Sequence, residues 1–470
     1  MASRKIVIDP VSRIEGHLGI EVEVLKGRVV DAHTMATLFR GFEIILQGRD
    51  PRDAQHITQR ICGVCSASHA LAASYNLDNA FGVTPPENAR IIRNLAVGAN
   101  FIHSHILHFY HLAALDYVLG PDTPPFIPRY KGDYRLPKDV NDACVGHYLE
   151  ALQMRILAHE MRTLLAGKAP HHVGFVPGGV THAPTVDKIA GYLWRLRKVQ
   201  DFINNVYVPD VLAIASVYKD YKDIGKGHGN LLAYGVFDLD SSGKNKLLKR
   251  GRYTRKRLSD VDAAKITEDV KHSWYKDDTS GRNPTEGATE PQVHKPGAYS
   301  WAKSPRYDGQ PHEVGPLARM WVNGDYQEGI SVIDRHAARA LECQKIANAL
   351  EGWLLELKPG QPIWTECSVP ESSEGCGMVE APRGALGHWV KIRNKKIENY
   401  QCVVPTTWNV CPRDDKGIRG PIEEALIDTP VADPDNPIEV VRVVRSFDPC
   451  LACTVHLIKP NGQIKKFRVV

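Results

Sequence analysis

The pattern of apolar and polar residues near the N-terminus predicts β-strands. Apolar side chains alternate with polar ones from Leu18 to Val24, and a Lys26-Gly27 turn leads to a return strand that starts at Val29. The stretch from Lys5 to Asp9 predicts a further short strand. We therefore expect a β-hairpin to open the fold, within a β segment at about residues 4–45.

Longer segments repeat apolar residues at the spacing of an α-helix. Asn88 can cap a helix that runs to about Val118. Further helical patterns occupy about 140–167, 185–217 and 331–357. Between about 220 and 318 the helical periodicity disappears and Gly, Asp, Lys, Ser and Tyr dominate, which predicts an irregular insertion.

Strand-like alternation returns towards the C-terminus, where His388 to Ile392 and Ile397 to Val404 flank a polar turn. The expected fold class is α+β and mainly helical, with long central helices forming a bundle that β-sheet segments flank at both ends. No internal repeat, low-complexity tract or clear linker divides the chain. We therefore expect one interdependent unit.

Composition excludes several classes of protein. A chain of 470 residues with 43% hydrophobic and 24% charged residues is typical of a folded globular protein. Its 59 basic and 54 acidic residues leave a net charge of only +5, which does not favour binding to nucleic acid or to a membrane surface. No apolar run reaches the roughly 18 residues that cross a bilayer. The charged start followed by Asp9-Pro10 gives no secretory signal peptide, so export would need another carrier.

Ten cysteines are too few for a disulfide framework, yet four of them form two Cys-x-x-Cys pairs. The first pair is Cys62 and Cys65, on a glycine-containing turn that leads into a helical run. His69 follows one turn later, where it can hydrogen-bond the nearer sulfur. Taken alone, this pair is compatible with a metal site, with redox thiols or with incidental cysteines.

The second pair is Cys450 and Cys453, near the other end of the chain. Pro449 fixes the backbone immediately before it, and Asp448 adds a hydrogen-bond acceptor. Two such pairs indicate a site with four cysteine ligands, for which structural zinc is the first interpretation. Soft thiolates also suit nickel and iron.

Four further segments carry acidic, basic and histidine side chains that a structural zinc site does not need. They are Asp9-Pro10-Val-Ser-Arg13-Ile-Glu15-Gly-His17, Phe39-Arg40-Gly41-Phe42-Glu43, Glu380-Ala-Pro382-Arg383-Gly384-Ala-Leu-Gly-His388-Trp389 and Val404-Pro-Thr406-Thr-Trp408-Asn409. Together with the two cysteine motifs they resemble the large, catalytic subunit of nickel-iron hydrogenases of the uptake type. The resemblance runs from Ile8 to His456, which is essentially the whole chain.

This resemblance implies a buried centre in which four thiolates bind nickel and two of them bridge to an iron that carries carbon monoxide and cyanide. Cys62 and Cys450 would be terminal ligands of nickel, whereas Cys65 and Cys453 would bridge. The resemblance also implies the groups around the metals: Arg383 on one cyanide, Thr406 on the other, and Asp116, Asp448 and Pro382 beside them.

The resemblance further implies a proton carrier and a third ion. Glu15 would exchange a proton with the sulfur of Cys450, for which burial has to raise its pKa. Glu43 and His456, with the backbone carbonyl of Cys402, would hold a magnesium or iron ion.

The implied activity is the reversible, heterolytic cleavage of H2 to protons and electrons. No further cysteines have iron-sulfur spacing, so the electrons would pass to an iron-sulfur small subunit in a heterodimer. The remaining candidates, Cys367, Cys376, Cys402 and Cys411, are expected to be buried small hydrophobes. The resemblance implies export of the folded heterodimer on the partner's twin-arginine signal. This chain would then lie in the periplasm or on the outer face of the membrane, and a cytoplasmic enzyme is the alternative.

The segment 457–470 has two interpretations. Asn461-Gly462 favours a terminal β-hairpin. The resemblance instead implies a maturation peptide, which an endopeptidase removes after His456 once nickel chaperones have loaded the metal, so that the given sequence is a precursor. The expected catalytic unit is then 1–456. It comprises the β segment at about 4–45, a helical core at about 60–218 and 331–357, the insertion at about 220–318 and a metal-binding segment at about 360–456.

Three rival functions stay open from the sequence alone. One is an H2-sensing regulatory subunit, although sensors of this kind commonly lack a C-terminal tail. The others are a four-cysteine zinc protein and a scaffold subunit of a respiratory complex, whose relatives have lost the metal cysteines. The histidines at 103, 105, 108 and 111 are expected to be satisfied core or interface residues, with a proton-carrying or structural role near the metals as the alternative.

Overall fold

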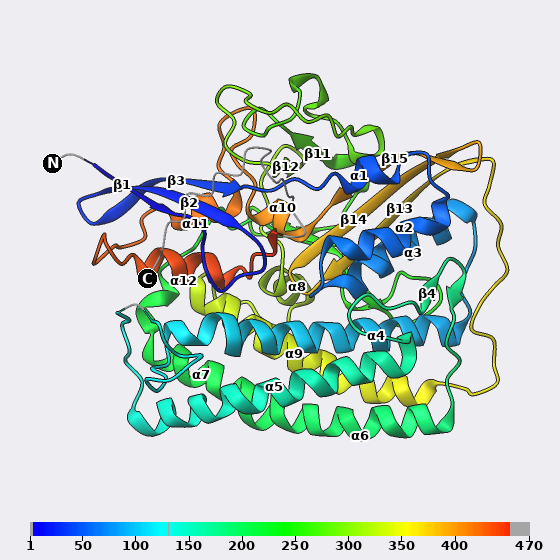
Figure 1. Cartoon of the computed structure of the whole chain (residues 1–470), viewed down its shortest axis with the longest axis horizontal. Helices are drawn as coiled ribbons and strands as arrows, with labels where there is room; N and C mark the ends of the chain where they lie inside the picture. The colour runs from blue at the N-terminus through cyan, green and yellow to red at the C-terminus, as the bar shows by residue number, and fades with distance from the viewer. Residues whose placement is uncertain (1–2, 130, 452–470) are drawn as a thin grey trace.

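The computed structural model describes residues 3–129 and 131–451. Cys453, His456 and the predicted maturation segment 457–470 therefore lie outside the described residues. Helices and sheets are mixed, and helices hold the larger share of the residues, in agreement with the α+β class (Figure 1).

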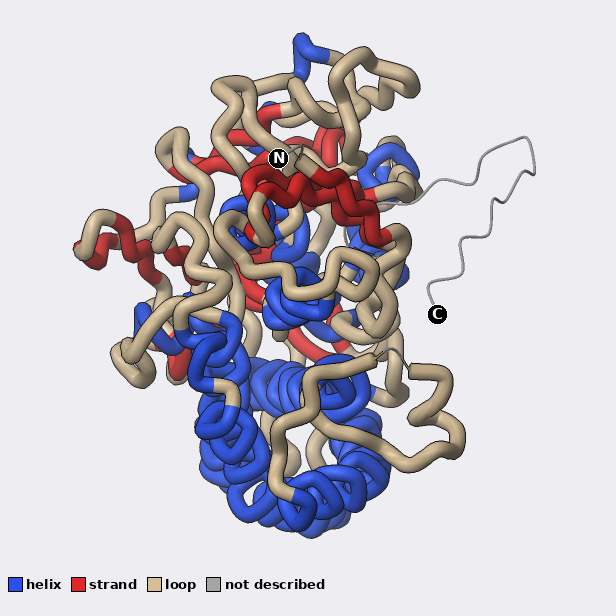
Figure 2. Tube along the Cα trace, turned by 90° about the vertical axis from the view of Figure 1, so that its left-hand side faces the viewer, coloured by secondary structure: helices blue, strands red, loops and turns tan. Residues whose placement is uncertain are grey.

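Long helices form a layer on one side of the molecule, with the strands gathered on the other side (Figure 2). Helix α4 (Glu87–Ile106) packs against α5 (Lys138–Ala166) and α9 (Val332–Glu356). Helix α6 (Val186–Phe202) also contacts α5 and α9, and α7 (Val208–Val217) follows it and packs on α9. These positions confirm the helices that the apolar spacing predicts.

The long helix predicted to reach Val118 differs in detail. After Ile106 the chain forms a π-helical segment, Leu107–Ala113, and then a short 3-10 turn, Ala114–Asp116. Apolar spacing does not distinguish these hydrogen-bond patterns from an α-helix, and π-helical turns occur mostly at functional sites. Within this segment His108 Nε2 lies 2.7 Å from the carbonyl oxygen of Arg445.

The predicted N-terminal hairpin is confirmed. Strands β1 (Arg4–Ile8), β2 (Leu18–Leu25) and β3 (Arg28–Ala36) form an antiparallel sheet in that order. Ile20 and Val22 of β2 are fully buried, as the period-two pattern requires.

A second antiparallel sheet lies towards the C-terminus, in the order β13 (Ser372–Ala381), β14 (Gly384–Arg393) and β15 (Lys396–Val403). Helix α3 (Ser66–Phe81) packs directly on β13. A Cβ atom at Gly375 or Gly377 would lie 2.2 Å or 2.1 Å from a carbonyl oxygen of α3, so only glycine permits this approach. The contact places the start of α3, and with it the first cysteine pair, against the turn between β13 and β14.

Short strands and 3-10 turns occupy the segment that the sequence predicts as an irregular insertion. The short strands of the chain are β4 (Phe175–Val176), β5 (Gly179–Val180), β6 (Leu231–Ala233), β7 (Val236–Asp238), β8 (Lys246–Leu248), β9 (Gly251–Thr254), β10 (Arg257–Ser259), β11 (Ile266–Asp269) and β12 (Ser304–Tyr307). The remaining short helices are α1 (Phe42–Leu46), α2 (Ala54–Thr58), α8 (Pro316–Asn323), α10 (Pro405–Asn409), α11 (Pro421–Leu426) and α12 (Ile438–Ser446).

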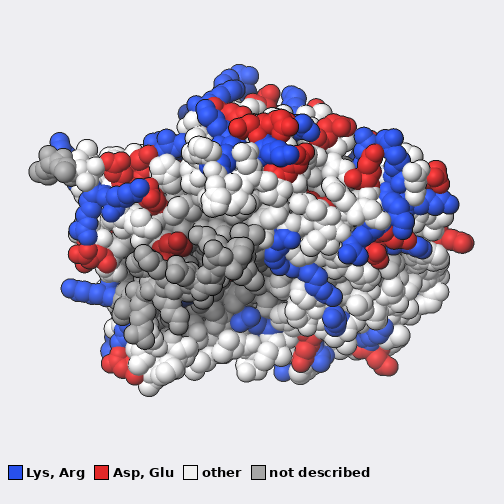
Figure 3. Space-filling view, turned by 45° about the horizontal axis from the view of Figure 1, so that its top comes forward, with Lys and Arg blue, Asp and Glu red and all other residues white. Residues whose placement is uncertain are grey.

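Basic and acidic side chains lie interspersed on the face that Figure 3 shows, in keeping with the small net charge. Within residues 3–129 and 131–451, no helix has the length and apolar character needed to cross a bilayer.

Candidate metal centre

Three cysteines from opposite ends of the chain meet in the interior. The Sγ atoms of Cys62 and Cys450 are 3.3 Å apart although 388 positions separate the two residues. The sulfur of Cys65 completes a group whose ligand atoms all lie within 4.8 Å of one another. All three side chains are buried, so the fold brings the first predicted pair and Cys450 of the second together at one point.

The local backbone structure favours the thiolate form in the first cysteine pair. A 3-10 turn, Gln59–Ile61, ends at Cys62, and Cys65 caps the N-terminus of α3. The backbone N–H groups of Val64 and Cys65 donate to Cys62 Sγ at 3.3 and 3.4 Å. These donors, together with the positive end of the helix dipole, favour the negatively charged form of a thiol.

Cys450 is held from two sides. Its backbone N–H donates to Thr406 Oγ1 at 3.0 Å, which leaves the threonine hydroxyl hydrogen for another acceptor. Glu15 lies alongside in a parallel β-bridge, and its carbonyl accepts from the N–H of Leu451 at 2.7 Å. The Sγ atom of Cys450 is 3.1 Å from Glu15 Oε2. A proton can therefore pass directly between this sulfur and a half-buried carboxylate.

Arg383 is the buried cation of the site. Its Nε donates to the carbonyl oxygen of Asp448 at 3.0 Å, and its Nη2 pairs with the Asp448 carboxylate at 3.0 Å. Burial opposes the charge, but Asp448 and the three cysteine sulfurs hold the pKa of Arg383 well above its ordinary value. Asp448 has a φ of 55°, a left-handed conformation that Asp adopts more readily than most residues.

His69 is buried beside the cysteines, but the expected hydrogen bond to a sulfur is not formed. Its Nδ1 lies 3.2 Å from Nε2 of His388, whose Nδ1 is 2.9 Å from the hydroxyl of Tyr400. Its Nε2 is buried without a hydrogen-bond partner among the residues described. Burial lowers the pKa of His69 to about 4, against the raising effect of Cys62, so the ring is neutral.

Asp116 ends the 3-10 turn that follows the π-helical segment and is buried between two arginines. Its Oδ1 accepts from Arg445 Nη1 at 2.6 Å and from Nη2 of Arg13. Pro382 lies at the turn before Arg383, where its carbonyl oxygen accepts from Arg319 Nη2 at 2.8 Å.

Glu43 and Cys402, the two described candidates for the third ion, are neighbours. Oε1 of Glu43 accepts from the backbone N–H of Cys402 at 2.9 Å, and Oε2 accepts from the hydroxyl of Thr289. Close by, Lys303 Nζ lies 3.2 Å from Glu268 Oε2. Burial raises the pKa of Glu268, with Lys303 opposing and Glu43 adding to this effect.

This set of groups fits a bound metal of soft character. Buried sulfurs close enough to share one ion are the ligands that zinc, nickel and iron prefer. The unpartnered Nε2 of His69 and the Arg383 guanidinium, which Asp448 pairs with beside the sulfurs, are groups that an anionic ligand of the metal could contact. Geometry alone leaves the choice of metal open.

Comparison with known families decides the class of protein. Residues 40–122, 120–329 and 323–456 match the family described as nickel-dependent hydrogenase, and residues 5–38 match one described as HoxL-like. The chain belongs to the nickel-dependent hydrogenase family.

Individual hydrogenases resemble the chain over nearly its whole length. The periplasmic [NiFeSe] hydrogenase large subunit of Desulfomicrobium baculatum is 46% identical, covering 97% of this chain and 95% of the relative. The uptake hydrogenase large subunit of Bradyrhizobium diazoefficiens is 38% identical, covering 98% and 96%. The solved Ni-Fe-Se hydrogenase of D. vulgaris Hildenborough in the reduced state superposes with a TM-score of 0.95 at 49% identity, covering 97% of this chain and all of that one.

Several groups of this hydrogenase chain have positions that the sequence did not reveal. The histidines at 103, 105, 108 and 111 meet the expectation of satisfied core residues only in part. His105 Nε2 lies 2.9 Å from Glu342 Oε1 and His111 Nε2 is 3.2 Å from the carbonyl of Tyr148, but the Nδ1 atom of each of the four is buried without a hydrogen-bond partner among the residues described. Glu342 itself belongs to a buried charge cluster with Arg319 and Glu380 that sequence analysis missed. The apolar sequence around Arg319, Glu342 and Glu380 was the signal that could have indicated this cluster. A charged residue among apolar neighbours is either exposed to water or paired with another charge.

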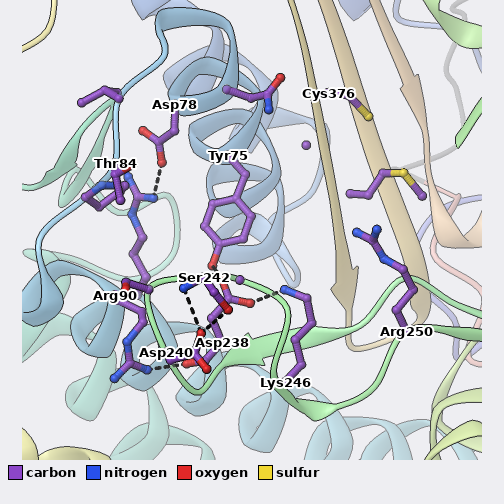
Figure 4. A pocket seen from close by; sticks show the side chains of 18 of the residues that line it. Tyr75, Asp78, Thr84, Arg90, Asp238, Asp240, Ser242, Lys246, Arg250 and Cys376 are labelled. Atoms are coloured by element: carbon purple, nitrogen blue, oxygen red, sulfur yellow. Dashed lines mark hydrogen bonds and ion pairs between the residues drawn. The ribbon is translucent and has the colours of Figure 1, made fainter. Parts of the chain in front are cut away.

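A surface cleft of about 720 Å³ is separate from the cysteine cluster (Figure 4). Its charged side chains are largely paired, since Arg93 Nη1 contacts Asp78 Oδ2 at 2.5 Å and the hydroxyl of Tyr75 donates to Asp238 at 2.8 Å. Cys376 lines this cleft and is half-buried rather than fully buried as predicted. Cys367 and Cys402 are also half-buried, whereas Cys411 is buried.

Proposed function

We propose that this chain is the large, catalytic subunit of a hydrogenase that holds nickel and iron on Cys62, Cys65, Cys450 and Cys453 and interconverts H2 with two protons and two electrons. The observation that carries the proposal is the meeting of Cys62, Cys65 and Cys450 at one buried point in a member of the nickel-dependent hydrogenase family. Cys453 belongs to the set by its motif position.

The residues of the chain divide the work of the reaction. When bound, the nickel-iron group supplies the Lewis-acid and redox chemistry that splits H2. Cys450 Sγ receives a proton and passes it to Glu15 Oε2, 3.1 Å away, on the route to solvent. Arg383, fixed by Asp448, holds a positive charge over the sulfurs. The buried surroundings exclude water and strengthen these electrostatic interactions.

The diatomic ligands of iron and the third ion are part of the proposal. Arg383 and the free hydroxyl hydrogen of Thr406 are donors suited to two cyanides, and Asp116 and Pro382 complete the enclosure. Glu43, the carbonyl of Cys402 and His456 would bind magnesium or iron, for which oxygen and imidazole are suitable ligands.

The electron acceptor is proposed to be an iron-sulfur small subunit. The relatives that match along the whole length are large subunits, which implies a small one. The relative from Desulfomicrobium baculatum is named as periplasmic, and we propose the same location for this protein.

Metal analysis of the heterodimer purified without oxygen tests the proposed function. We expect nickel, iron beyond that of the small subunit's clusters, H2-dependent reduction of a dye, and infrared bands of carbon monoxide and cyanide. Selenium is not expected in the chain, because cysteine stands at all four motif positions although two of the relatives are named for selenium. Zinc in place of nickel, with no H2 oxidation, would contradict the proposal.

We further propose that 457–470 is a maturation peptide. The intact mass of the large subunit from active, nickel-loaded enzyme is expected to end at His456, whereas chain made without nickel keeps the full 470 residues. Active enzyme that retains residues 457–470 would refute the cleavage and leave the hydrogenase activity untouched.

A further inference from the structure

A fully buried arginine lies behind the turn that carries Arg383. Arg319 is on α8, and its partners Glu342 on α9 and Glu380 on β13 are equally inaccessible to solvent. A buried charge of this kind is costly unless every donor is paired. The hydrogen bonds of Arg319 therefore indicate what the residue holds in place.

All five N–H donors of Arg319 are engaged. Nε and Nη2 donate to the two oxygens of Glu342 at 2.7 and 2.6 Å, and Nη1 donates to Glu380 at 2.7 Å. The remaining donors reach two successive backbone carbonyls, Ala381 O at 2.9 Å and Pro382 O at 2.8 Å. Guanidinium has the fixed fork geometry for this arrangement, whereas a lysine ammonium has only three donors.

These two carbonyls immediately precede Arg383. The turn also touches the start of α8, because a Cβ atom at Gly384 would lie only 2.7 Å from the backbone nitrogen of Gly315. The pKa of Glu342 is lowered to about 2: burial alone would raise it, but Arg319 and His105 more than offset burial, so the clamp keeps a fixed negative charge. Helices α8 and α9 and the end of β13 are thereby held to the short backbone segment that precedes Arg383.

We propose that Arg319 is the positioning residue of Arg383: it clamps the carbonyls of residues 381 and 382 and so fixes where the Arg383 guanidinium lies over the cysteines. This inference rests on the proposed function, since it assigns Arg383 to the reaction. A displacement of about 1 Å in a catalytic group can lower a rate about 100-fold, even when the altered residue never touches the reacting atoms.

Substitution Arg319→Lys tests the clamp in the intact heterodimer. We expect nickel and iron contents equal to those of the wild type, an altered nickel EPR spectrum and a kcat lowered about 10- to 100-fold. Arg93→Lys is the matched control, because Arg93 is also buried and holds a carboxylate, Asp78, and the carbonyls of Val176 and Gly179. It is expected to lower the thermal midpoint and to leave kcat and the EPR spectrum unchanged.

A double-mutant cycle with Arg383→Lys separates positioning from general destabilisation. If Arg319 acts through Arg383, adding Arg319→Lys to Arg383→Lys changes kcat by less than about threefold, because coupled residues are non-additive. Multiplicative effects would overturn the proposal, as would a metal-loaded Arg319→Lys enzyme with wild-type kcat or a variant that fails to load nickel. Each of these results is compared with active wild-type enzyme. An inactive wild type would instead contradict the proposed function.

Discussion

Replacing Cys62 by Ser is expected to remove nickel from the protein and to abolish H2 oxidation. The Cys62 sulfur shares one buried point with Cys65 and Cys450, and two backbone N–H groups donate to it. A serine hydroxyl keeps the shape but is a hard donor that stays protonated near neutral pH, so it cannot replace a soft thiolate. We expect nickel affinity to fall by more than the roughly 100-fold that is typical when only the orientation of a metal ligand is disturbed.

Elemental analysis and H2-dependent dye reduction measure this effect. The matched control is Cys376→Ser, since Cys376 is half-buried in the surface cleft and lies outside the cysteine cluster. That variant is expected to keep its full complement of nickel and iron. Normal nickel content in Cys62→Ser would remove Cys62 from the ligand set, and loss of nickel in both variants would point to misfolding.

Of all parts of the structure, the metal centre is the one that the sequence predicted in most detail. Two Cys-x-x-Cys pairs indicate a shared site, and the 3.3 Å between the sulfurs of Cys62 and Cys450 agrees with that prediction across 388 positions. Local patterns were sufficient here because metal ligands must converge, whatever the path of the chain between them. The hairpin of β1 to β3 was predictable for a different reason, since one buried face imposes strict alternation.

Strand β13 could not be predicted in the same way. Its sequence contains Gly375 and Gly377, which weaken a strand pattern, and both glycines are needed for the approach of α3. The change from α-helix to π-helix at Leu107 was equally hidden, because the apolar spacing continues through it. In both places tertiary packing, rather than local preference, determines the backbone.

Buried charge was the main feature of the site that sequence analysis missed. Arg319, Glu342 and Glu380 are each fully buried, although charged residues in a sequence are normally taken as solvent-exposed. Their pairing depends on residues up to 61 positions apart, so no local pattern could reveal it. The family resemblance directed attention to Arg383, whereas the residues behind it became visible only from the fold.

Glu15→Gln is expected to slow H2 oxidation by about 100- to 10,000-fold, the range typical of losing a general acid–base group. Glutamine can still accept a hydrogen bond from the Cys450 sulfur, 3.1 Å from the present carboxylate oxygen. It cannot take up the proton at neutral pH, so transfer stops at the sulfur while the cysteine ligands are unchanged. Nickel and iron contents are therefore expected to equal those of the wild type, and kcat should fall.

The control is Glu21→Gln on the neighbouring strand β2, where Glu21 pairs with exposed Lys5 at 2.7 Å. Its kcat is expected to stay within about twofold of the wild type, because substitution in a surface ion pair costs little. A wild-type kcat in metal-loaded Glu15→Gln would show that protons leave the Cys450 sulfur by another route. Loss of nickel in that variant would instead make Glu15 a structural support of Cys450, through the β-bridge that already joins the two residues.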